Sequence, residues 1–287
     1  MKAARAIIAM LSIVLLATVW AKRAHAWGQD GHSIIAEIAE RRLDASTLEK
    51  IRLLLRTELP TMKDAQPALV SLASVASWGD DYRAQHSETS RWHFVDIPLE
   101  RSTYIASEDC RLDPQYGDCI INAIERNRIT LANCAKPAIE RAAALKFLVH
   151  LIGDIHQPLH VTDHNGDHGG NAVIVTFFGQ PAKLHAVWDT YLITHTVYAW
   201  GAYVVRLETT WFAGRDLRGL DAGSPVDWAL ETHQVARDVV YDFPRDGGLP
   251  QAYYAKALPA VDRQLALAGL RLARFLRETL QPTASCP

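Results

Sequence analysis

The sequence predicts an all-α fold, a single mostly helical domain with one small β-hairpin. Apolar residues recur at helical spacing along most of the chain, and only one short stretch has the composition of a strand. No Pro/Ser-rich linker, internal repeat or low-complexity run divides the chain after residue 26. The remaining length of about 260 residues is at the upper end for one domain. We therefore expect one domain over residues 27–287.

The first 26 residues have the pattern of a cleaved signal peptide. Lys2 and Arg5 precede an apolar stretch over residues 6–20, and Ala24-His25-Ala26 follows as a small-x-small cleavage site. The apolar stretch is shorter than the roughly 20 residues of a membrane-spanning helix, although an uncleaved anchor is the alternative. We expect a secreted or periplasmic protein that begins at Trp27 and has no membrane segment after cleavage.

Four segments are expected to be helical. Ser33–Leu55 alternates apolar and charged residues at helical spacing. Ala138–Ile155 is apolar around much of its circumference and lacks a proline, which is typical of a buried central helix that ends before Pro158. Val226–Tyr241 and Tyr254–Leu280 have the pattern of amphipathic helices.

The one expected strand is Ala172–Phe178. It is rich in β-branched and aromatic residues, and Gly179-Gln180-Pro181 follows it. These three residues could turn the strand into a hairpin.

Cleavage after Ala26 would make the protein more acidic. The leader carries four basic residues and no acid, so 26 basic and 32 acidic residues remain. An acidic protein is a poor candidate for binding nucleic acid through a broad basic surface. Any phosphate recognition must be local, for example through bound metal ions.

Four cysteines remain in the mature chain: Cys110, Cys119, Cys134 and Cys286. An even number in an exported protein favours disulfides. Three pairings are possible, and the sequence does not choose among them. Cys110 with Cys119 would close a short polar loop and leave Cys134 for Cys286. No C-x-x-C pair is present, which disfavours a thiolate zinc site.

Histidines and aspartates recur at paired spacings. His150 and Asp154 lie four residues apart on the expected central helix, and therefore on one helix face. His185 and Asp189 repeat this spacing, and His160 follows Pro158. Asp80 and His93 precede these pairs, in Ser-Trp-Gly-Asp and Arg-Trp-His-Phe.

Any one of these histidines could be a hydrogen-bonded core residue, and Asp154 could simply pair with His150. Taken together, however, so many buried imidazole and carboxylate groups all need partners. Nitrogen and oxygen ligands without thiolate suit zinc, with open positions for water and substrate. The new N-terminus adds to this set. The α-amino nitrogen and carbonyl oxygen of Trp27 could chelate a metal ion, and His32 could close over the same ion.

In this order, the motifs of the chain resemble the S1/P1 nuclease family. The resemblance extends from Trp27 to Asp189. It rests on Trp-Gly-x3-His (27–32), Trp-x-Asp-x2-Arg (78–83), His-Phe-x-Asp (93–96), His-x3-Asp-x-His-Gln-Pro-Leu-His (150–160), Gly-Gly-Asn (169–171) and Leu-His-x2-Trp-Asp (184–189).

The resemblance implies a mostly helical fold with three zinc ions at the base of a cleft. It assigns one zinc to Asp80, His93, His150 and Asp154, and a second to His160, His185 and Asp189. It assigns the third to Trp27, His32 and Asp154, so that Asp154 bridges two ions. His156 is not a ligand in the family, and we expect a structural role for it.

The resemblance also implies a catalytic and a base-binding group. Asp80 would orient the attacking water, and Arg83 would stabilise charge in the transition state. Phe94 and Asp96 match base-binding positions, where a ring stacks on an unstacked base and a carboxylate accepts hydrogen bonds. Arg83 could instead form a surface ion pair, and Phe94 could be core. Ligation by Asp81 in place of Asp80 is a further alternative, since Gly79 adds backbone freedom.

The implied function is hydrolysis of single-stranded DNA and RNA to 5′-phosphorylated products, together with 3′-nucleotidase activity. Nothing in the sequence indicates a stable protein partner. A zinc-dependent phospholipase C is the closest alternative enzyme, but that family usually ends its metal set with His-x3-Glu rather than with the spacing of His185 and Asp189. A periplasmic zinc-storage protein without catalysis is the second alternative, to which the histidines at His164 and His168 point.

Overall fold

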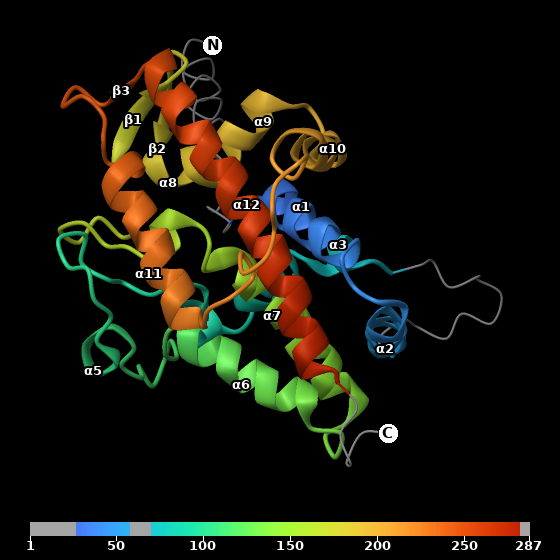
Figure 1. The fold of residues 1–287 in the computed structure, drawn as a ribbon. Coiled ribbons are helices and arrows are strands. Elements are labelled where there is room, and N and C mark those ends of the chain that lie inside the picture. The colour runs from blue at the N-terminus through green and yellow to red at the C-terminus, as the bar shows by residue number, and fades with distance from the viewer. Residues whose placement is uncertain (1–26, 58–69, 282–287) are drawn as a thin grey trace, which may run out of the picture.

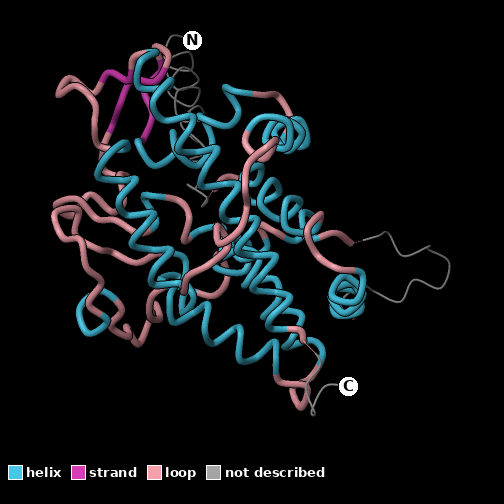
Figure 2. Tube along the Cα trace, viewed as in Figure 1, coloured by secondary structure: helices cyan, strands magenta, loops and turns pink. Residues whose placement is uncertain are grey.

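The computed structural model describes residues 27–57 and 70–281. Within these ranges the chain is mostly helical, and a small sheet lies at one edge of the molecule (Figures 1 and 2). The expected signal peptide, residues 1–26, lies outside the described residues. Among the helices of the described part, none is long and apolar enough to cross a membrane.

The longer helices bury an apolar face in a common core. They are α1 (Gln29–Glu40), α2 (Ala45–Arg56), α6 (Ile120–Ala132), α7 (Ala138–Asp154), α10 (Trp200–Thr210), α11 (Pro225–Val235) and α12 (Gln251–Thr279). Short helical turns connect them: α3 (Leu72–Val75), α4 (Trp78–Arg83), η1 (Ser87–His93), α5 (Ala106–Asp109), η2 (Pro158–His160), α8 (Leu184–Ala186), η3 (Val187–Tyr191), α9 (Leu192–Thr196) and η4 (Ala236–Val240).

Helix α7 is the centre of the core. It is buried along nearly its whole length after Arg141, and α6, α12, α1 and α2 all pack against it (Figure 1). Neighbours on several sides explain why its apolar residues cover so much of the circumference. The expected helix over Ala138–Ile155 is thus confirmed, with its last residue at Asp154.

The helical pattern expected over Ser33–Leu55 corresponds to two helices rather than one. Helix α1 ends at Glu40, and Asp44 then begins α2 by accepting a hydrogen bond from the Thr47 backbone N–H at 2.9 Å. An aspartate in this position satisfies an otherwise unpaired N–H of the first turn. The apolar periodicity continues across the break because both helices bury one face.

The two helices expected near the C-terminus are confirmed. Helix α11 continues directly into the π-helical turn η4, and together they span Pro225–Val240. Helix α12 begins at Gln251 and keeps Pro259 within it. Ser224 and Asp227 form a capping box that fixes the start of α11.

The expected hairpin is also confirmed. Strands β1 (Ile174–Phe177) and β2 (Gln180–Lys183) pair antiparallel, with Ile174 opposite Lys183. A third strand, β3 (Gly248–Leu249), adds to β1 in parallel and completes the order β2-β1-β3. Two residues are too few to leave a strand pattern in the sequence, so β3 was not expected.

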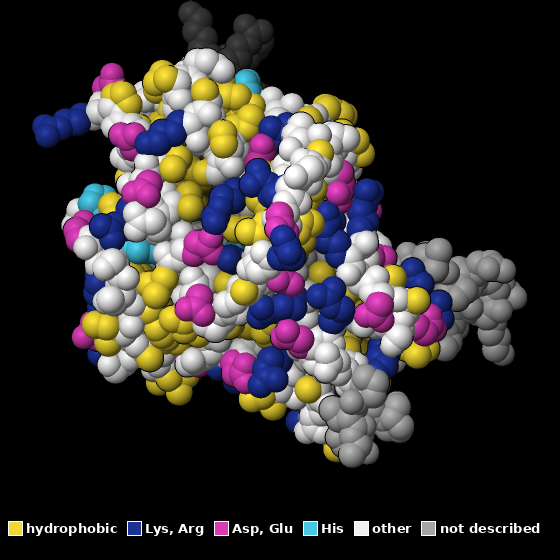
Figure 3. Space-filling view, in the orientation of Figure 1, with side chains coloured by type: hydrophobic (Ala, Val, Ile, Leu, Met, Phe, Trp, Pro, Cys, Tyr) yellow, Lys and Arg dark blue, Asp and Glu magenta, His cyan; other side chains and the backbone are white. Residues whose placement is uncertain are grey.

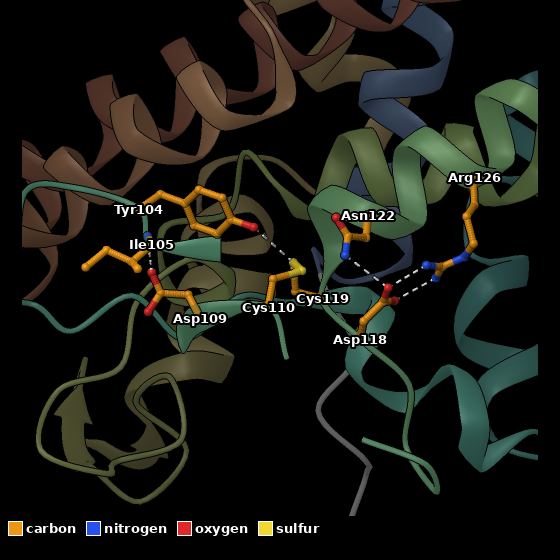
Figure 4. The surroundings of a disulfide bond; sticks show 8 residues. All are labelled: Tyr104, Ile105, Asp109, Cys110, Asp118, Cys119, Asn122 and Arg126. Atoms are coloured by element: carbon orange, nitrogen blue, oxygen red, sulfur yellow. Dashed lines mark hydrogen bonds and ion pairs between the residues drawn. A yellow bond between two sulfur atoms is a disulfide. The ribbon is translucent and has the colours of Figure 1, made fainter. Parts of the chain in front are cut away.

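One of the possible disulfide pairings is present. Cys110 and Cys119 are joined, with their Cα atoms 4.8 Å apart, and the bond lies beside the start of α6 (Figure 4). Next to it, Arg126 forms two hydrogen bonds of 2.6 and 2.7 Å to the carboxylate of Asp118. Cys286 lies outside the described residues, so its pairing with Cys134 stays a prediction.

Charged side chains of both signs are mixed on the surface. On the face drawn in Figure 3, Lys and Arg side chains are interspersed with Asp and Glu. This face therefore offers no broad basic surface for a phosphate backbone, in line with the acidic composition.

Candidate metal centre

The fold brings all eight of the expected histidine and aspartate ligands into three adjoining groups. Each group could hold a metal ion, because its nitrogen and oxygen atoms all lie within 4.8 Å of one another. The groups are His32, His150 and Asp154; Asp80, His93 and His150; and His160, His185 and Asp189. The side chains come from α1, α4, η1, α7, η2, α8 and η3, so segments far apart in the sequence build one centre.

Asp154 lies between the groups, and its two oxygen atoms face different neighbours. Oδ2 is 3.1 Å from both His150 Nε2 and His93 Nδ1. Oδ1 is 3.2 Å from His32 Nε2 and 4.0 Å from His160 Nδ1. A carboxylate in this position can donate one oxygen to each of two cations, which is the bridging arrangement that the resemblance implies.

The group of His160, His185 and Asp189 is compact. His185 Nε2 is 3.1 Å from Asp189 Oδ2, and His160 Nε2 is 3.9 Å from Asp189 Oδ1. Asp189 lies on the π-helical turn η3, a widened type of helical turn that is frequent at functional sites. Gln157 donates a hydrogen bond of 2.5 Å to Asp189 Oδ1 and orients this carboxylate.

Backbone carbonyls orient three of the histidine rings. In each ring Nδ1 donates to a carbonyl oxygen at 2.6–2.9 Å: His150 to Ala76, His160 to His93, and His185 to Gly169. These hydrogen bonds assign the proton of each neutral ring to Nδ1, so that Nε2 presents its lone pair to the centre.

The geometry of the rings favours a bound cation. The Nε2 atoms of His160 and His185 are only 3.2 Å apart. With both protons on Nδ1, two lone pairs face each other at this distance, which is unfavourable unless a positive charge lies beside them. A metal ion that accepts both lone pairs removes the repulsion.

Several buried polar atoms of the centre have no hydrogen-bond partner. They include both ring nitrogens of His32, Nε2 of His93, and Oδ1 of Asp154. A buried polar atom without a partner destabilises a fold by about 1–3 kcal/mol. His32 Nε2 lies 3.2 Å from Asp154 Oδ1, yet neither atom has a hydrogen-bond partner. The donor set therefore fits metal ions.

The electrostatics of the centre also favour positive charge. Burial lowers the pKa of His93 to about 4, which keeps this ring neutral near pH 7. Burial acts in the same direction on His150, but the carboxylates of Asp154 and Asp80 outweigh it and raise the pKa of His150 to about 9. The centre thus holds a proton near neutral pH, which a metal ion would displace.

Asp80, rather than Asp81, faces the centre. Asp80 is 4% exposed, and its Oδ1 lies 3.8 Å from His150 Nε2, whereas the neighbouring Asp81 is exposed. Gly79 packs flat against the same ring, since a Cβ atom there would be 2.7 Å from His150 Cδ2. Close packing therefore explains the glycine better than the backbone freedom that we expected it to provide.

A pocket of about 270 Å³ opens onto the group of His160, His185 and Asp189. His160 and His185 line it together with Arg83, Phe94 and Asp96, so two of the expected ligands share one cavity with the expected cation and base-binding residues. Arg83 reaches back to Asp80, with Nη2 2.8 Å from Oδ1, while its side chain stays 25% exposed. The ion pair named as the alternative for Arg83 is thus present, but inside the site.

Phe94 and Asp96 differ in their surroundings. Phe94 is half-buried, so one part of its ring is available to the pocket. Asp96 lines the pocket and is exposed to solvent on its open side. Partial desolvation at the pocket wall, together with the carboxylate of Asp163, raises the pKa of Asp96 to about 6.

Three residues of the site were given no role from the sequence. Gln157 orients Asp189, and His168 and Asn171 line the pocket. Asn171 belongs to the Gly-Gly-Asn motif, which was the available signal. Gly169 in that motif has φ +60° and lies so close to Leu159 that a Cβ would be 2.3 Å from its carbonyl oxygen.

The start of the described chain lies beside the centre. The Gly28 backbone N–H donates to the Asp189 carbonyl at 2.8 Å, and the fully buried Trp27 packs against Gly31. His32 follows one helical turn later, stacked on the His150 ring at 4.1 Å. Trp27 is therefore close in the chain to both Asp189 and His32 contacts of the centre: Gly28 binds the Asp189 backbone, and Gly31 precedes His32.

His156 is structural, as expected. Its Nδ1 donates to the Ile152 carbonyl at 2.7 Å, and its Nε2 accepts from Arg271 at 2.9 Å. Burial and the charge of Arg271 lower the pKa of His156 to about 3, so the ring is neutral and joins α7 to α12.

The fold and the site define a helical protein with a histidine- and aspartate-rich metal centre beneath a small pocket. Comparison with known proteins identifies the family. The sequence model described as S1/P1 Nuclease matches residues 27–281, and the chain belongs to the S1/P1 nuclease family.

Named nucleases match nearly the whole chain. Nuclease S1 of Aspergillus oryzae is 30% identical over 289 residues, which are 93% of this chain and 96% of that protein. Endonuclease 2 of Arabidopsis thaliana is 28% identical over 295 residues, covering 92% and 95% of the two chains. Nuclease P1 of Penicillium citrinum is 27% identical over 276 residues, covering 88% and 97%. The chain is accordingly a nuclease, a hydrolase of phosphodiester bonds.

Proposed function

We propose that the mature protein is an exported, zinc-dependent endonuclease that begins at Trp27. It hydrolyses single-stranded DNA and RNA to 5′-phosphorylated products and also acts as a 3′-nucleotidase. The observation that carries this proposal is the shared cavity: His160 and His185 line the same pocket as Arg83, Phe94 and Asp96. Candidate metal ligands, a cation for phosphate and an aromatic ring for a base thus line one pocket.

Three zinc ions fit the donor set. Asp80, His93, His150 and Asp154 would hold one ion, and His160, His185 and Asp189 a second. The Trp27 amino nitrogen and carbonyl oxygen, His32 and Asp154 would hold the third. The opposite orientation of the two Asp154 oxygens supports the shared role of this carboxylate. Bound zinc would supply Lewis acidity and lower the pKa of water near neutrality.

The protein's own residues position the reacting groups. Asp80 is a buried acceptor that can hold a water molecule in line with the phosphorus atom. Arg83 can bind a non-bridging phosphate oxygen while it keeps its ion pair with Asp80. Each hydrogen bond that is stronger in the transition state than in the ground state accelerates hydrolysis.

The pocket accounts for a preference for single strands. A base can stack on the half-buried ring of Phe94 and donate to Asp96 only if it has left the stack of a duplex. The mixed surface charge gives no continuous track for a duplex backbone on the face of Figure 3. In this proposal, recognition rests on the unstacked base and on the phosphate that Arg83 binds.

Metal analysis and a substrate panel test the proposal. Protein that begins at Trp27 should contain about three zinc ions and cleave single-stranded DNA, RNA and 3′-AMP, but degrade duplex DNA and phosphatidylcholine far more slowly. Products from DNA and RNA should carry 5′-phosphate, and 3′-AMP should yield adenosine and inorganic phosphate. Preferential hydrolysis of phosphatidylcholine would assign the centre to a phospholipase, and zinc-loaded protein without turnover of any phosphodiester would contradict the proposal.

A further inference from the structure

His168 has an uncommon backbone conformation at the wall of the pocket. Its φ is +56°, in the left-handed region that side-chain-bearing residues rarely adopt. Two neighbours hold it there. Asp163 Oδ1 accepts from the His168 backbone N–H at 3.1 Å, and the Asn171 side-chain amide donates to the His168 carbonyl at 2.9 Å. Such conformations persist only where the surroundings impose them, and they cluster at binding sites.

This conformation leaves the imidazole of His168 exposed on the pocket. Among the residues that the structure describes, the ring has no hydrogen bond, ion pair or ring contact. Phe94 lines the same pocket, which has a volume of about 270 Å³. Asp96 is an electrostatic neighbour of His168.

The polar groups of the pocket match one base better than the others. An ionised Asp96 is only an acceptor, and a neutral imidazole supplies one N–H donor. Guanine presents two adjacent donors, N1–H and N2–H₂, beside the acceptor O6. Adenine presents an acceptor, N1, where guanine has a donor, and would face the carboxylate with a lone pair.

We propose that His168 is a specificity-determining residue that donates a hydrogen bond to the base in the pocket and, together with Asp96, selects guanine. This inference rests on the proposed function and adds a base preference to it. Asp96 would accept from guanine N1–H and N2–H₂, while His168 would donate to O6. Phe94 would support the face of the ring.

The test compares His168→Gly with Asn165→Gly. Glycine adopts positive φ readily, so His168→Gly removes the imidazole without straining the backbone. Asn165 also has φ +56° and lies in the same loop, but it does not line the pocket. Its replacement is therefore a matched control for the change in backbone freedom.

The readout is kcat/KM for dinucleotides and 3′-mononucleotides of the four bases, at about pH 7.5, above the ordinary pKa range of carboxyl groups. The wild type and Asn165→Gly should prefer guanine by roughly 3- to 10-fold, the worth of one hydrogen bond. His168→Gly should lose this preference, keep its activity on the other bases within about twofold, and melt at the same or a higher temperature. His168→Gln, which keeps a hydrogen-bond donor on the side chain, should retain part of the preference for guanine.

The inference would be overturned by an active wild type with no preference for guanine, or by an unchanged preference in His168→Gly. An equal loss of activity on all four bases in His168→Gly would also overturn it, because it would assign His168 to the phosphate or the fold. Failure of the zinc-loaded wild type to cleave any of these substrates would instead contradict the proposed function itself.

Discussion

At the scale of single residues, Asp154 joins the groups of the metal centre because its two oxygens face different histidines. Asp154→Asn should remove the charge shared by two metal ions. We expect bound zinc to fall below the wild-type content and kcat to fall by at least about a hundredfold. Atomic absorption and a single-strand cleavage assay measure the two effects.

Asp81→Asn is the matched control for this variant. Asp81 is an exposed carboxylate next to Asp80 that does not face the centre, so its replacement should change neither zinc content nor turnover. Full zinc occupancy and near-normal turnover in Asp154→Asn would rule out the bridging role.

Phe94 should contribute to substrate binding more than to stability. Phe94→Ala should weaken binding of single-stranded substrate by about 1–3 kcal/mol, the usual worth of a base-stacking contact, and leave zinc bound. Phe243, which is half-buried outside this pocket, is the control residue. A loss of several kcal/mol of unfolding free energy with an unchanged KM would show that Phe94 is core instead.

Asp96 should make base binding depend on pH. Its pKa is raised from the ordinary value of 3.8 to about 6, so the carboxylate forms in the folded protein only as pH rises through about 6. Binding of bases that donate to a carboxylate should strengthen over this range. We expect KM for 3′-GMP to fall as pH rises from about 5 to 7. In Asp96→Asn this pH dependence of KM should be lost. An identical pH profile in the variant would exclude Asp96 as its source.

At the scale of elements, the disulfide loop supports the segment that carries His93 and Phe94. The Arg91 backbone N–H donates to the Tyr116 carbonyl at 2.9 Å, and the Ile120 N–H donates to the Phe94 carbonyl at 3.1 Å. The bond closes a loop with a sequence separation of 9 residues, just before α6 (Figure 4). Its constraint on the unfolded chain therefore also stabilises one wall of the pocket.

Replacing both Cys110 and Cys119 by serine should lower the free energy of unfolding by about 2–3 kcal/mol, the value expected for a loop of this length. KM should rise as well, because Phe94 loses a supporting neighbour, while zinc content should be retained. Urea unfolding and steady-state kinetics measure these effects. Serine substitution at Leu112, an exposed residue of the same loop, is the control. Unchanged stability in the double variant would contradict the expected contribution.

At the scale of the whole molecule, catalysis should require cleavage of the peptide bond before Trp27, which accompanies export. Trp27 is buried next to the centre, and the Gly28 N–H is bound to the Asp189 carbonyl. We expect the α-amino nitrogen of Trp27 to be a ligand. In the uncleaved precursor this nitrogen belongs to an amide, whose lone pair is delocalised into the carbonyl, so it is a poor ligand. Protein that retains a methionine before Trp27 should fold, lack one zinc ion and be nearly inactive.

The control for this prediction is the same sequence released from a cleavable fusion so that it begins at Trp27. This protein should be active, and excess zinc should not restore the methionine-bearing form, because its nitrogen is covalently blocked. Equal zinc content and equal cleavage of single-stranded DNA by both forms would exclude the N-terminal ligand.

The helical class, the central helix and the hairpin could be predicted from the sequence, and so could the histidines and aspartates that the fold brings together. Apolar residues recur at helical spacing along the chain, because one face of each helix must be buried. The spacing of His150 and Asp154 puts both on one face of α7 regardless of what surrounds them. A local pattern was misleading where a short feature interrupts it, as the Asp44 cap does between α1 and α2.

How these residues meet depends on the packing of distant segments. His93 and His150 are 57 residues apart in sequence yet have ring nitrogens 3.0 Å apart, and no spacing rule predicts such a contact. The same holds for Gly79 against His150 and for His168 at the pocket wall. The physical reason is that packing of distant segments sets these distances, whereas the sequence records only the local preferences of each segment.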